Sequence, residues 1–482
     1  MSKVTSELNQ KEALNGPKSA QTEPYFRQVG NGSSEPASAS KALPGKKVAE
    51  QIFRKTLASI DVGRTMLARI GKEGDRLVFP ASPTGSSASV SVARPPRVIA
   101  FGKAANQMAL SLHEILGGRI EAGVVVAPAA PLRRLEGFRY FVGGHPYPNA
   151  DSVAGAQAAL RLVTGLTLDD LVIFLISGGG SALFEKPLDP AVTLSDLIEF
   201  NQELVTCGLP IEQINVLRKH ISAVKGGRLA LSACPAGQLT IFISDVPEPL
   251  DSMVASGPTL PDPSTVEECY ALAGQNGLAG QFPPSIRRPF EERLLTETPK
   301  PGDARFSRSQ YWRLLSNCDA VEAARAAAEE MGFVAEVDRG EWDEDFREVA
   351  RANAAALDEL AAQHSGSQVC LVVGGEVTCP VTGGGTGGRN QAFALYAAGL
   401  IAGRRRVVLS AGTDGRDGNS PAAGAIADGT TLSRARAQNL DPDGYLAASD
   451  SYHFFRALGD TLEVGYTDNN VRDLRLWVDF GT

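Results

Sequence analysis

The sequence has few cysteines, few aromatic residues and no long hydrophobic segment. Its six cysteines are scattered over 482 residues, without a C-x-x-C pair or a histidine at metal-ligand spacing. This distribution argues against a zinc site or a disulfide framework and favours a reducing compartment. The longest apolar segments, such as Leu171–Ile176, have the length of a strand and are far too short to span a membrane. We therefore expect no membrane partner.

Positive charge is also scarce, because 47 Lys and Arg residues stand against 55 Asp and Glu residues, a formal net charge of −8. Without a basic stripe or an aromatic-plus-basic surface, nucleic acid is not an expected partner. The N-terminal region lacks the apolar core of a secretory signal and contains acidic residues that transit peptides avoid. The sequence predicts a cytoplasmic protein and leaves open whether it is a monomer or a homodimer.

The pattern along the chain predicts two α/β domains behind a tail. Residues 1–45 are rich in Ser, Gly, Asn, Pro and Gln without apolar periodicity, which predicts a disordered tail. Residues 46–300 alternate apolar strands with helices of about 10–15 residues, which predicts a larger Rossmann-like domain with a parallel sheet. For residues 301–482 the sequence predicts a smaller α/β domain, whose last segment can pack back on the first domain.

Glycine, in contrast, is abundant, and many of the 50 glycines cluster at the ends of expected strands. Lys103 lies where the strand 97–103 meets a helix, and a helix N-terminus with a lysine favours phosphate. The turn after the strand 170–177 offers converging N–H groups and hydroxyls to an anion; it consists of Ser177, Gly178, Gly179, Gly180 and Ser181. The alternatives are a surface lysine and a tight structural turn. No G-x-x-x-x-G-K-[ST] pattern occurs, which excludes a Walker-type loop.

A basic cluster occupies the segment 214–230. It contains Arg218, Lys219, His220 and two further cations within about four helical turns. Arg218 and Lys219 cannot share one helix face with all the others, so only some of these side chains can reach a common site. A solvated run of charge is the alternative.

A second glycine-rich region precedes Arg389. Glu376 follows a double glycine, and a glycine-rich loop from Thr382 ends at Arg389, where a helix begins. The planar fork of arginine suits phosphoryl oxygens. The loop formally matches the G-x-G-x-x-G dinucleotide fingerprint, but the acidic residue expected about 20 positions later is missing. A flexible loop with a solvated arginine is the alternative.

Carboxylates follow two of the expected strands. Asp245 ends one strand, and Asp414 and Asp417 lie among glycines after another. Mg²⁺ prefers one or two carboxylates together with phosphate oxygens, so these residues are candidate metal ligands. Turn caps are the alternative, above all for Asp417.

These motifs occur in an order that resembles the glycerate kinases with a MOFRL-type C-terminal domain. RVIAFGKAA, LISGGGSAL, INVLRKHISAVKGGRLA, VVGGE, GGRNQ and GTDGRDG carry the resemblance. It implies transfer of the γ-phosphate of ATP to D-glycerate, most often at the 2-hydroxyl to give 2-phosphoglycerate, with Mg²⁺ or another divalent cation. It also implies an active site in a cleft between the larger N-terminal and the smaller C-terminal domain.

The resemblance further assigns roles to residues of this chain. Lys103 and Arg389 are the implied catalytic cations, and Asp245 and Asp414 are the candidate metal ligands. The remaining matched residues would bind substrate or nucleotide: Ser177, Gly178, Gly179, Gly180, Ser181, Asn215, Lys219, Glu376 and Asn470.

Three features depart from the family pattern. The residues 247–251 after Asp245 contain two prolines where glycine and acids are usual, and near the C-terminus Asp468 and Arg472 add charges. Two other functions stay open: an NAD(P)H-dependent oxidoreductase such as a hydroxypyruvate reductase, and an inactive sugar-acid-binding protein. The presence of Lys103 and Arg389 together with both metal carboxylates argues against the inactive protein.

Overall fold

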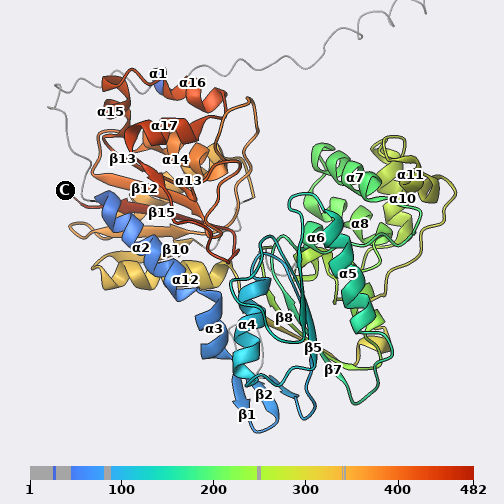
Figure 1. Ribbon diagram of the computed structural model, residues 1–482. Coiled ribbons are helices and arrows are strands. Elements are labelled where there is room, and N and C mark those ends of the chain that lie inside the picture. Colours follow the sequence, from blue (N-terminus) through green and yellow to red (C-terminus); the bar gives the residue numbers. More distant parts are fainter. Residues whose placement is uncertain are drawn as a thin grey trace, which may run out of the picture.

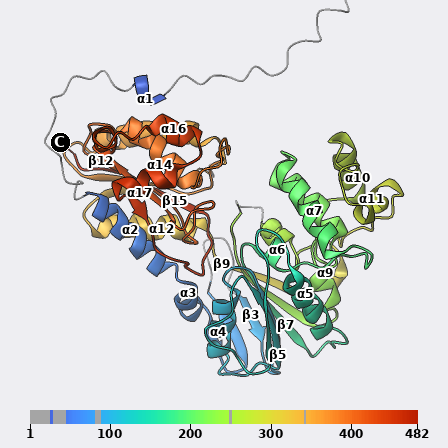
Figure 2. The same ribbon diagram turned by 45° about the horizontal axis from the view of Figure 1, so that its top comes forward.

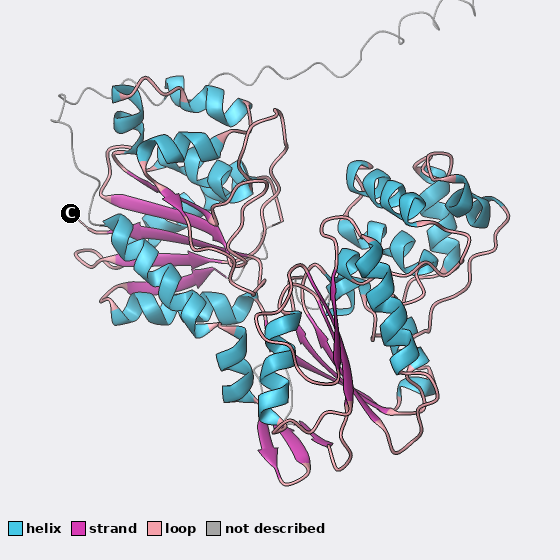
Figure 3. Ribbon diagram, viewed as in Figure 1, coloured by secondary structure: helices cyan, strands magenta, loops and turns pink. Residues whose placement is uncertain are grey.

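The computed structural model describes residues 25–28, 45–80, 88–246, 251–338, 340 and 343–481. Two six-stranded sheets lie in separate domains, each covered by helices (Figure 1). The same division of helices and strands is clear when the elements are coloured by type (Figure 3). The predicted fold class, two α/β domains with a parallel sheet in the first, is confirmed.

The sheet of the first domain is parallel throughout and has the order β6-β5-β4-β7-β8-β9. Its central strands are apolar on both faces because helices cover both sides. Its strands are β4 (Arg97–Phe101), β5 (Ala122–Ala127), β6 (Phe138–Val142), β7 (Leu171–Ile176), β8 (Gly237–Ile243) and β9 (Ser309–Leu315). The carboxyl ends of β4, β7 and β8 therefore meet at one edge.

Helices α3 (Val62–Arg69) and α4 (Ala105–Ile115) pack on one face of this sheet, and α5 (Ala150–Leu162) and α9 (Arg228–Ser232) pack on the other. A small antiparallel sheet completes the first face. Its strands are β1 (Gly71–Glu73), β2 (Arg76–Phe79) and β3 (Ala88–Ser91).

A helical lobe extends from the carboxyl edge of the first sheet (Figure 2). Its apolar core contains Leu197, Phe200, Leu217 and Phe282. The lobe consists of α7 (Leu194–Thr206), α8 (Ile211–Ile221), α10 (Val266–Gln275) and α11 (Pro284–Glu291). Two short helices, α6 (Gly180–Leu183) and the 3₁₀ helix η2 (Asp251–Ser256), join it to the sheet.

The second sheet is mixed and has the order β10-β11-β15-β12-β13-β14. The C-terminal strand β15 lies antiparallel between β11 and β12, so the last residues of the chain form the centre of this domain. The strands are β10 (Val334–Asp338), β11 (Val369–Val373), β12 (Arg406–Gly412), β13 (Gly424–Asp428), β14 (Thr461–Leu462) and β15 (Asp473–Asp479).

Helices cover both faces of the second sheet. On one face α12 (Asn317–Glu330) packs beside α2 (Gly45–Ser59). The other face carries α13 (Phe346–Gln363), α14 (Arg389–Leu400), α15 (Thr431–Ala437), α16 (Pro442–Ala447) and α17 (Ser451–Leu458). None of the helices in the described ranges is long and apolar enough to cross a bilayer.

The structure differs from the predicted domain boundaries at two elements. Helix α2, expected in the first domain, buries Ile52 and Phe53 against the second sheet, and Lys46 lies 2.5 Å from Asp460 there. Strand β9, expected in the second domain, pairs with β8 in the first sheet. Both segments carry ordinary amphipathic patterns, so their sequences do not indicate which of the two sheets they join.

The predicted disordered tail falls almost wholly on residues 1–24 and 29–44, which lie outside the described residues. Between them, Tyr25–Gln28 forms the short helix α1. Tyr25 stacks on Tyr396 with ring centroids 4.2 Å apart, and Phe26 is buried. The expectation of a tail without structure is therefore wrong at these four residues.

Candidate active site

A cavity of about 1030 Å³ opens between the two domains. Its lining includes six of the residues predicted from the sequence, four from the first domain and two from the second. They are Gly179, Ser181, Asn215, Asp245, Glu376 and Arg389. The structure thus brings together motifs that are more than 200 residues apart in the sequence.

Lys103 lies at the carboxyl end of β4, directly against the turn that follows β7. Its backbone N–H donates to the Gly178 carbonyl over 3.0 Å, and the Ser177 hydroxyl accepts from the N–H of Ala104 over 3.0 Å. The Lys103 ammonium forms an ion pair of 2.7 Å with Asp414 of the second domain. Lys103 is therefore held at the junction of both domains, beside the turn 177–181.

The glycine at position 178 is required by a close approach of three segments. A Cβ atom there would lie 2.2 Å from Asp245 Oδ2 and 2.3 Å from Asn470 Nδ2, closer than atoms can pack. The Asn470 amide donates to Asp245 over 3.2 Å across the domain boundary. Burial, with the nearby Glu376 charge, raises the pKa of Asp245 to about 6. The Asp245 carboxylate therefore lies in a site that would gain from a bound cation.

Polar side chains join the turn to helix α8. Ser181 Oγ lies 2.8 Å from Ser256 Oγ, and the Ser256 hydroxyl donates to Asn215 Oδ1 over 3.0 Å. Gly180, in the same turn, has no space for a side chain, because its Cβ would lie 2.6 Å from that of Ala255. The network fixes one wall of the cavity.

Arg389 begins α14 and is held by two acids. Asp473 accepts from Nε over 2.6 Å and from Nη2 over 3.1 Å, and Glu376 pairs with Nη1 over 2.6 Å. The Asp473 carboxylate is 1% exposed and fixes the guanidinium from behind, whereas Glu376 lines the cavity. Burial raises the pKa of Glu376.

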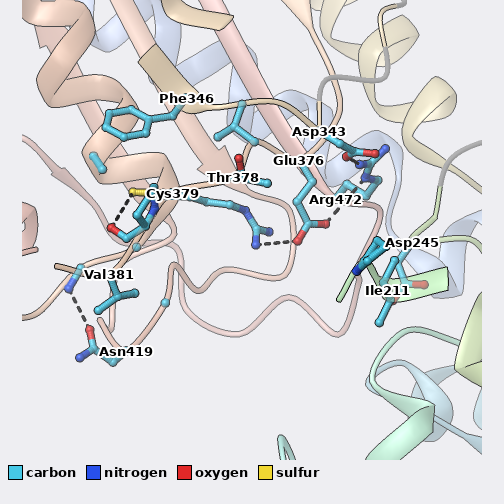
Figure 4. A pocket seen from close by; sticks show the side chains of 18 of the residues that line it. Ile211, Asp245, Asp343, Phe346, Glu376, Thr378, Cys379, Val381, Asn419 and Arg472 are labelled. Atoms are coloured by element: carbon cyan, nitrogen blue, oxygen red, sulfur yellow. Dashed lines mark hydrogen bonds and ion pairs between the residues drawn. The ribbon is translucent and has the colours of Figure 1, made fainter. Parts of the chain in front are cut away.

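Arg472 adds a further cation to the cavity wall. Its backbone has the left-handed φ of +66°, unusual for a residue with a side chain. It pairs with Asp343, and its Nε lies 3.7 Å from Glu376, which therefore lies between two arginines (Figure 4). The charge that departs from the family pattern is thus part of the site. The other added charge, Asp468, is absent from the cavity lining, and its pKa is raised by burial and by Asp61 beside helix α3.

Other predicted residues have structural partners away from the cavity. Lys219 is buried in an ion pair of 3.0 Å with Asp262. Asp417 accepts from the N–H groups of Asn390 and Gln391 over 3.1 and 2.8 Å. It therefore caps α14, which agrees with the alternative that Asp417 is a cap and not a metal ligand.

The glycine-rich loop before Arg389 is packed within its own domain. Cβ atoms at Gly383 and Gly385 would lie 2.4 and 2.7 Å from the Ala448 carbonyl, and one at Gly388 would lie 2.3 Å from Asp417. The loop N–H groups of Thr386 and Gly387 donate to Asp450 and Asn419. These glycines serve close packing that positions Arg389.

His145 lies beside the turn 177–181, a position that the sequence pattern did not indicate. Its ring edge lies beside Gly179, where a Cβ atom would be 3.2 Å from His145 Cδ2 and 3.3 Å from Lys103 Cγ. Partial loss of hydration and the Lys103 charge lower the pKa of His145 to about 4, although His145 is exposed at the surface. The only feature of the sequence that could have indicated His145 is its position three residues after β6 ends at Val142.

One side of the cavity is apolar and belongs to the second domain. Phe346, Cys379 and Val381 lie together there, while Glu376, Arg472 and Asp245 lie on the other side (Figure 4). Val381 is 85% exposed, so this apolar surface is open to a ligand. The cavity therefore combines an apolar end with a charged end.

The carboxylates of the site can be tested against the requirements of Mg²⁺. In the described part of the chain, no three His, Cys, Asp or Glu side chains are placed to hold a metal by themselves. Mg²⁺ usually takes one or two carboxylates plus phosphate oxygens, a set that Asp245 and Asp414 would fit with a nucleotide. The residues 247–250, which depart from the family pattern, lie outside the described residues.

The chain matches known families over most of its length. Residues 48–291 match a family described as a domain of unknown function (DUF4147), and residues 369–473 match the MOFRL family. A D-glycerate 2-kinase of Thermotoga maritima is 35% identical over 89% of this chain and 97% of its own. A protein of Agrobacterium vitis provisionally named hydroxypyruvate reductase is 36% identical over 78% of this chain and 86% of its own.

A solved structure has the same architecture. The crystal structure of a glycerate kinase from Thermotoga maritima superposes with a TM-score of 0.76 at 33% identity, covering 90% of this chain and 99% of that one. The fold and the site thus define a two-domain DUF4147–MOFRL protein. Within that class, the chain belongs to the glycerate kinase family.

Proposed function

We propose that this kinase transfers the γ-phosphate of ATP to D-glycerate and produces 2-phosphoglycerate. The observation that carries the proposal is that Arg389 of the second domain lines the cavity with Asp245, while Lys103 of the first domain lies beside Gly179 of the same wall. The names of the relatives support glycerate as the substrate and, for the Thermotoga protein, the 2-hydroxyl as the position.

Phosphoryl transfer requires positioning and neutralisation of charge more than covalent chemistry. Arg389 is paired with Glu376, which lines the cavity, and Lys103 is paired with Asp414 of the second domain. Phosphoryl oxygens would compete with these carboxylates for the two cations. Asp473 would keep the Arg389 fork aimed while Glu376 gives way, because Asp473 is bonded to Nε and Nη2.

Mg²⁺ is proposed as the divalent cation, with Asp245 and Asp414 as its protein ligands. Lys103 is bonded to Asp414 and its charge also lowers the pKa of Asp245, so both carboxylates lie within its electrostatic range. When bound, Mg²⁺ would neutralise phosphate charge. The raised pKa of Asp245 supports this placement, because a buried carboxylate near Glu376 has excess negative charge to offset.

The apolar end of the cavity is proposed to receive the base of ATP. Glycerate is small and polar, whereas a purine ring needs apolar walls of the kind that Pro380, Val381 and Leu446 offer. The phosphates would then extend past Arg389 toward Lys103 and Asp245. A cavity of about 1030 Å³ has room for both substrates.

Reduction of hydroxypyruvate is the alternative function, and the packing of the glycine-rich loop supports it less well than the kinase. A dinucleotide fingerprint presents its glycines to a pyrophosphate. Here Gly383 and Gly385 are packed against the Ala448 carbonyl, and only Gly385 of these two also lines the cavity. Incubation with hydroxypyruvate and NADH or NADPH should therefore leave the absorbance of the reduced cofactor unchanged.

The proposed function is tested by ADP release with D-glycerate, followed by NMR of the product to locate the phosphate ester. Lys103→Met and Arg389→Met should each lower turnover by about 10³-fold, because each removes a charge that stabilises the transferring group. Lys72→Met, which removes an exposed lysine of β1 far from the cavity lining, is the matched control. Near-normal turnover by Lys103→Met or Arg389→Met would overturn the assignment, and a product phosphorylated at the 3-hydroxyl would correct the position.

A further inference from the structure

Arg218 differs from the other arginines that line the cavity. The three in the second domain each form an ion pair with a carboxylate: Arg347 with Asp345, Arg389 with Glu376 and Asp473, and Arg472 with Asp343. Arg218 lines the same cavity from helix α8 of the first domain. Among the residues that the structure describes, it forms no hydrogen bond and has no carboxylate within 4.0 Å, and its Nε is buried.

A buried guanidinium atom without a partner is costly, because it has lost water and gained nothing in exchange. The carboxylate that acts electrostatically on Arg218 is that of Glu185, and the Cys207 thiol acts in the same direction. The Glu185 carboxylate is already occupied, since it accepts from Ser222 over 2.5 Å and pairs with Lys225. Burial lowers the pKa of Arg218, with Glu185 acting against this, but a guanidinium stays protonated.

The neighbours of Arg218 on the cavity wall add donors. Asn215 lies three residues earlier on α8, so both side chains share one helix face. Asn215 Oδ1 is occupied by the Ser256 hydroxyl, and within the described ranges no protein group accepts from the Asn215 amide nitrogen. This wall therefore offers a guanidinium and an amide N–H₂ to the cavity.

We propose that Arg218 binds the carboxylate of the acceptor acid, with Asn215 as a second donor. The proposal rests on the function proposed above and assigns the end of the site that recognises the acid. A fork of N–H groups matches a carboxylate in two parallel hydrogen bonds. The acceptor's carboxylate does not react, so it needs a fixed cation that is separate from Lys103 and Arg389. Arg218 meets this requirement because, among the described residues, it forms no ion pair.

The test compares Arg218→Met and Arg218→Lys with the wild type. We expect KM for D-glycerate to rise by about 10- to 100-fold in Arg218→Met, the range for losing a charge-assisted pair, while KM for ATP changes by less than about 2-fold. Arg218→Lys keeps the charge but not the fork and should fall between. Arg288→Met, which removes an exposed arginine of α11, is the matched control. Thermal unfolding confirms that each variant is folded.

Calorimetric binding of D-glycerate, glycerol and ADP separates the outcomes. Weaker binding of D-glycerate to Arg218→Met, with unchanged binding of ADP, supports the assignment. Glycerol, which lacks the carboxylate, should bind weakly to the wild type and to Arg218→Met alike. Weaker ADP binding with unchanged D-glycerate binding would show that Arg218 serves the nucleotide and would overturn it. Unchanged kinetics and binding in a folded Arg218→Met would overturn it as well.

Failure of the function itself gives a different result. A wild type that releases no ADP but binds D-glycerate in an Arg218-dependent manner would refute the kinase and leave the carboxylate site standing. A wild type that neither turns over nor binds D-glycerate, L-glycerate or lactate would refute both.

Discussion

Arg389, Glu376 and Arg472 form a row of alternating charges along the wall of the second domain. Glu376 is shared by the two arginines, at 2.6 Å from Arg389 Nη1 and 3.7 Å from Arg472 Nε. The acid offsets the repulsion between the two cations, and in the proposed reaction phosphate oxygens would take its place. Asp473 lies in β15 and its side chain is 1% exposed, so a ligand cannot replace it as the partner of Arg389.

Asp417 is the residue for which we expect a measurable pH dependence. Burial raises its pKa from 3.8 to about 7, with a contribution from Asp473. The folded protein therefore binds this proton more tightly than the unfolded chain does, and the stability falls as the pH rises from about 4 to about 7. Between pH 5 and pH 8 this costs about 3 kcal/mol.

Asp417→Asn removes the titrating group and keeps an oxygen that can accept from α14. We expect its unfolding free energy to decline less between pH 5 and pH 8 than that of the wild type, as measured by denaturant titrations at each pH. The raised pKa of Asp245 acts in the same direction in both proteins, so the difference isolates Asp417. If the unfolding free energies of the two proteins decline equally between pH 5 and pH 8, Asp417 is not the titrating group.

Among the elements, helix α2 has an unexpected place. It precedes the whole first domain in the sequence, yet its apolar face packs on β12, β15 and α12 of the second. Lys46 at its start forms ion pairs with Asp428 and Asp460 at 3.4 and 2.5 Å. The chain thus begins its described fold in the second domain and enters the first through α3.

Phe53→Ala tests this placement. Phe53 is fully buried, so the substitution leaves a cavity and should lower the unfolding free energy by about 3–5 kcal/mol. Hydrogen exchange should increase in β12, β15 and α12, with little change in β4 and β7 of the first sheet. Leu67→Ala, at an exposed position of α3, serves as the control. Faster exchange centred on β4 and β7 would refute the placement.

At the scale of the whole molecule, the site depends on contacts between the domains. The Lys103–Asp414 pair and the Asn470–Asp245 hydrogen bond cross the cleft, and the Tyr466 hydroxyl donates to the Lys103 carbonyl over 3.4 Å. Because the proposed substrates contact both walls, their binding should draw the domains together, as lids and hinged domains do in other enzymes.

Hydrogen exchange with ADP and D-glycerate tests this closure. We expect both ligands together to protect the turn 177–181 in the first domain and the segment 376–389 in the second, whereas ADP alone should protect mainly the second. Small-angle scattering should show a smaller radius of gyration with both ligands. Protection confined to one domain under all conditions would contradict closure around a shared site.

The sequence was sufficient where a local pattern decides the structure. The apolar segments that became β4, β7, β8, β11 and β12 end in the turns that carry Lys103, Gly178, Asp245, Glu376 and Asp414, and the structure places Asp245 and Glu376 in the cavity lining. The functional roles of these residues stay predictions. Cytoplasmic location and oligomeric state stay predictions. Lys219 was placed at the site by resemblance, and the structure instead pairs it with Asp262.

The sequence by itself thus determined the class of fold, the two α/β domains and the strand-end turns, because those depend on periodicity and on residues close in the chain. The tertiary structure alone decided that β15 lies at the centre of the second sheet and that α2 and β9 exchange domains, because strand pairing and helix packing join distant segments. It also decided which cations are already paired and that Arg218 is not, since counter-ions are chosen by three-dimensional proximity.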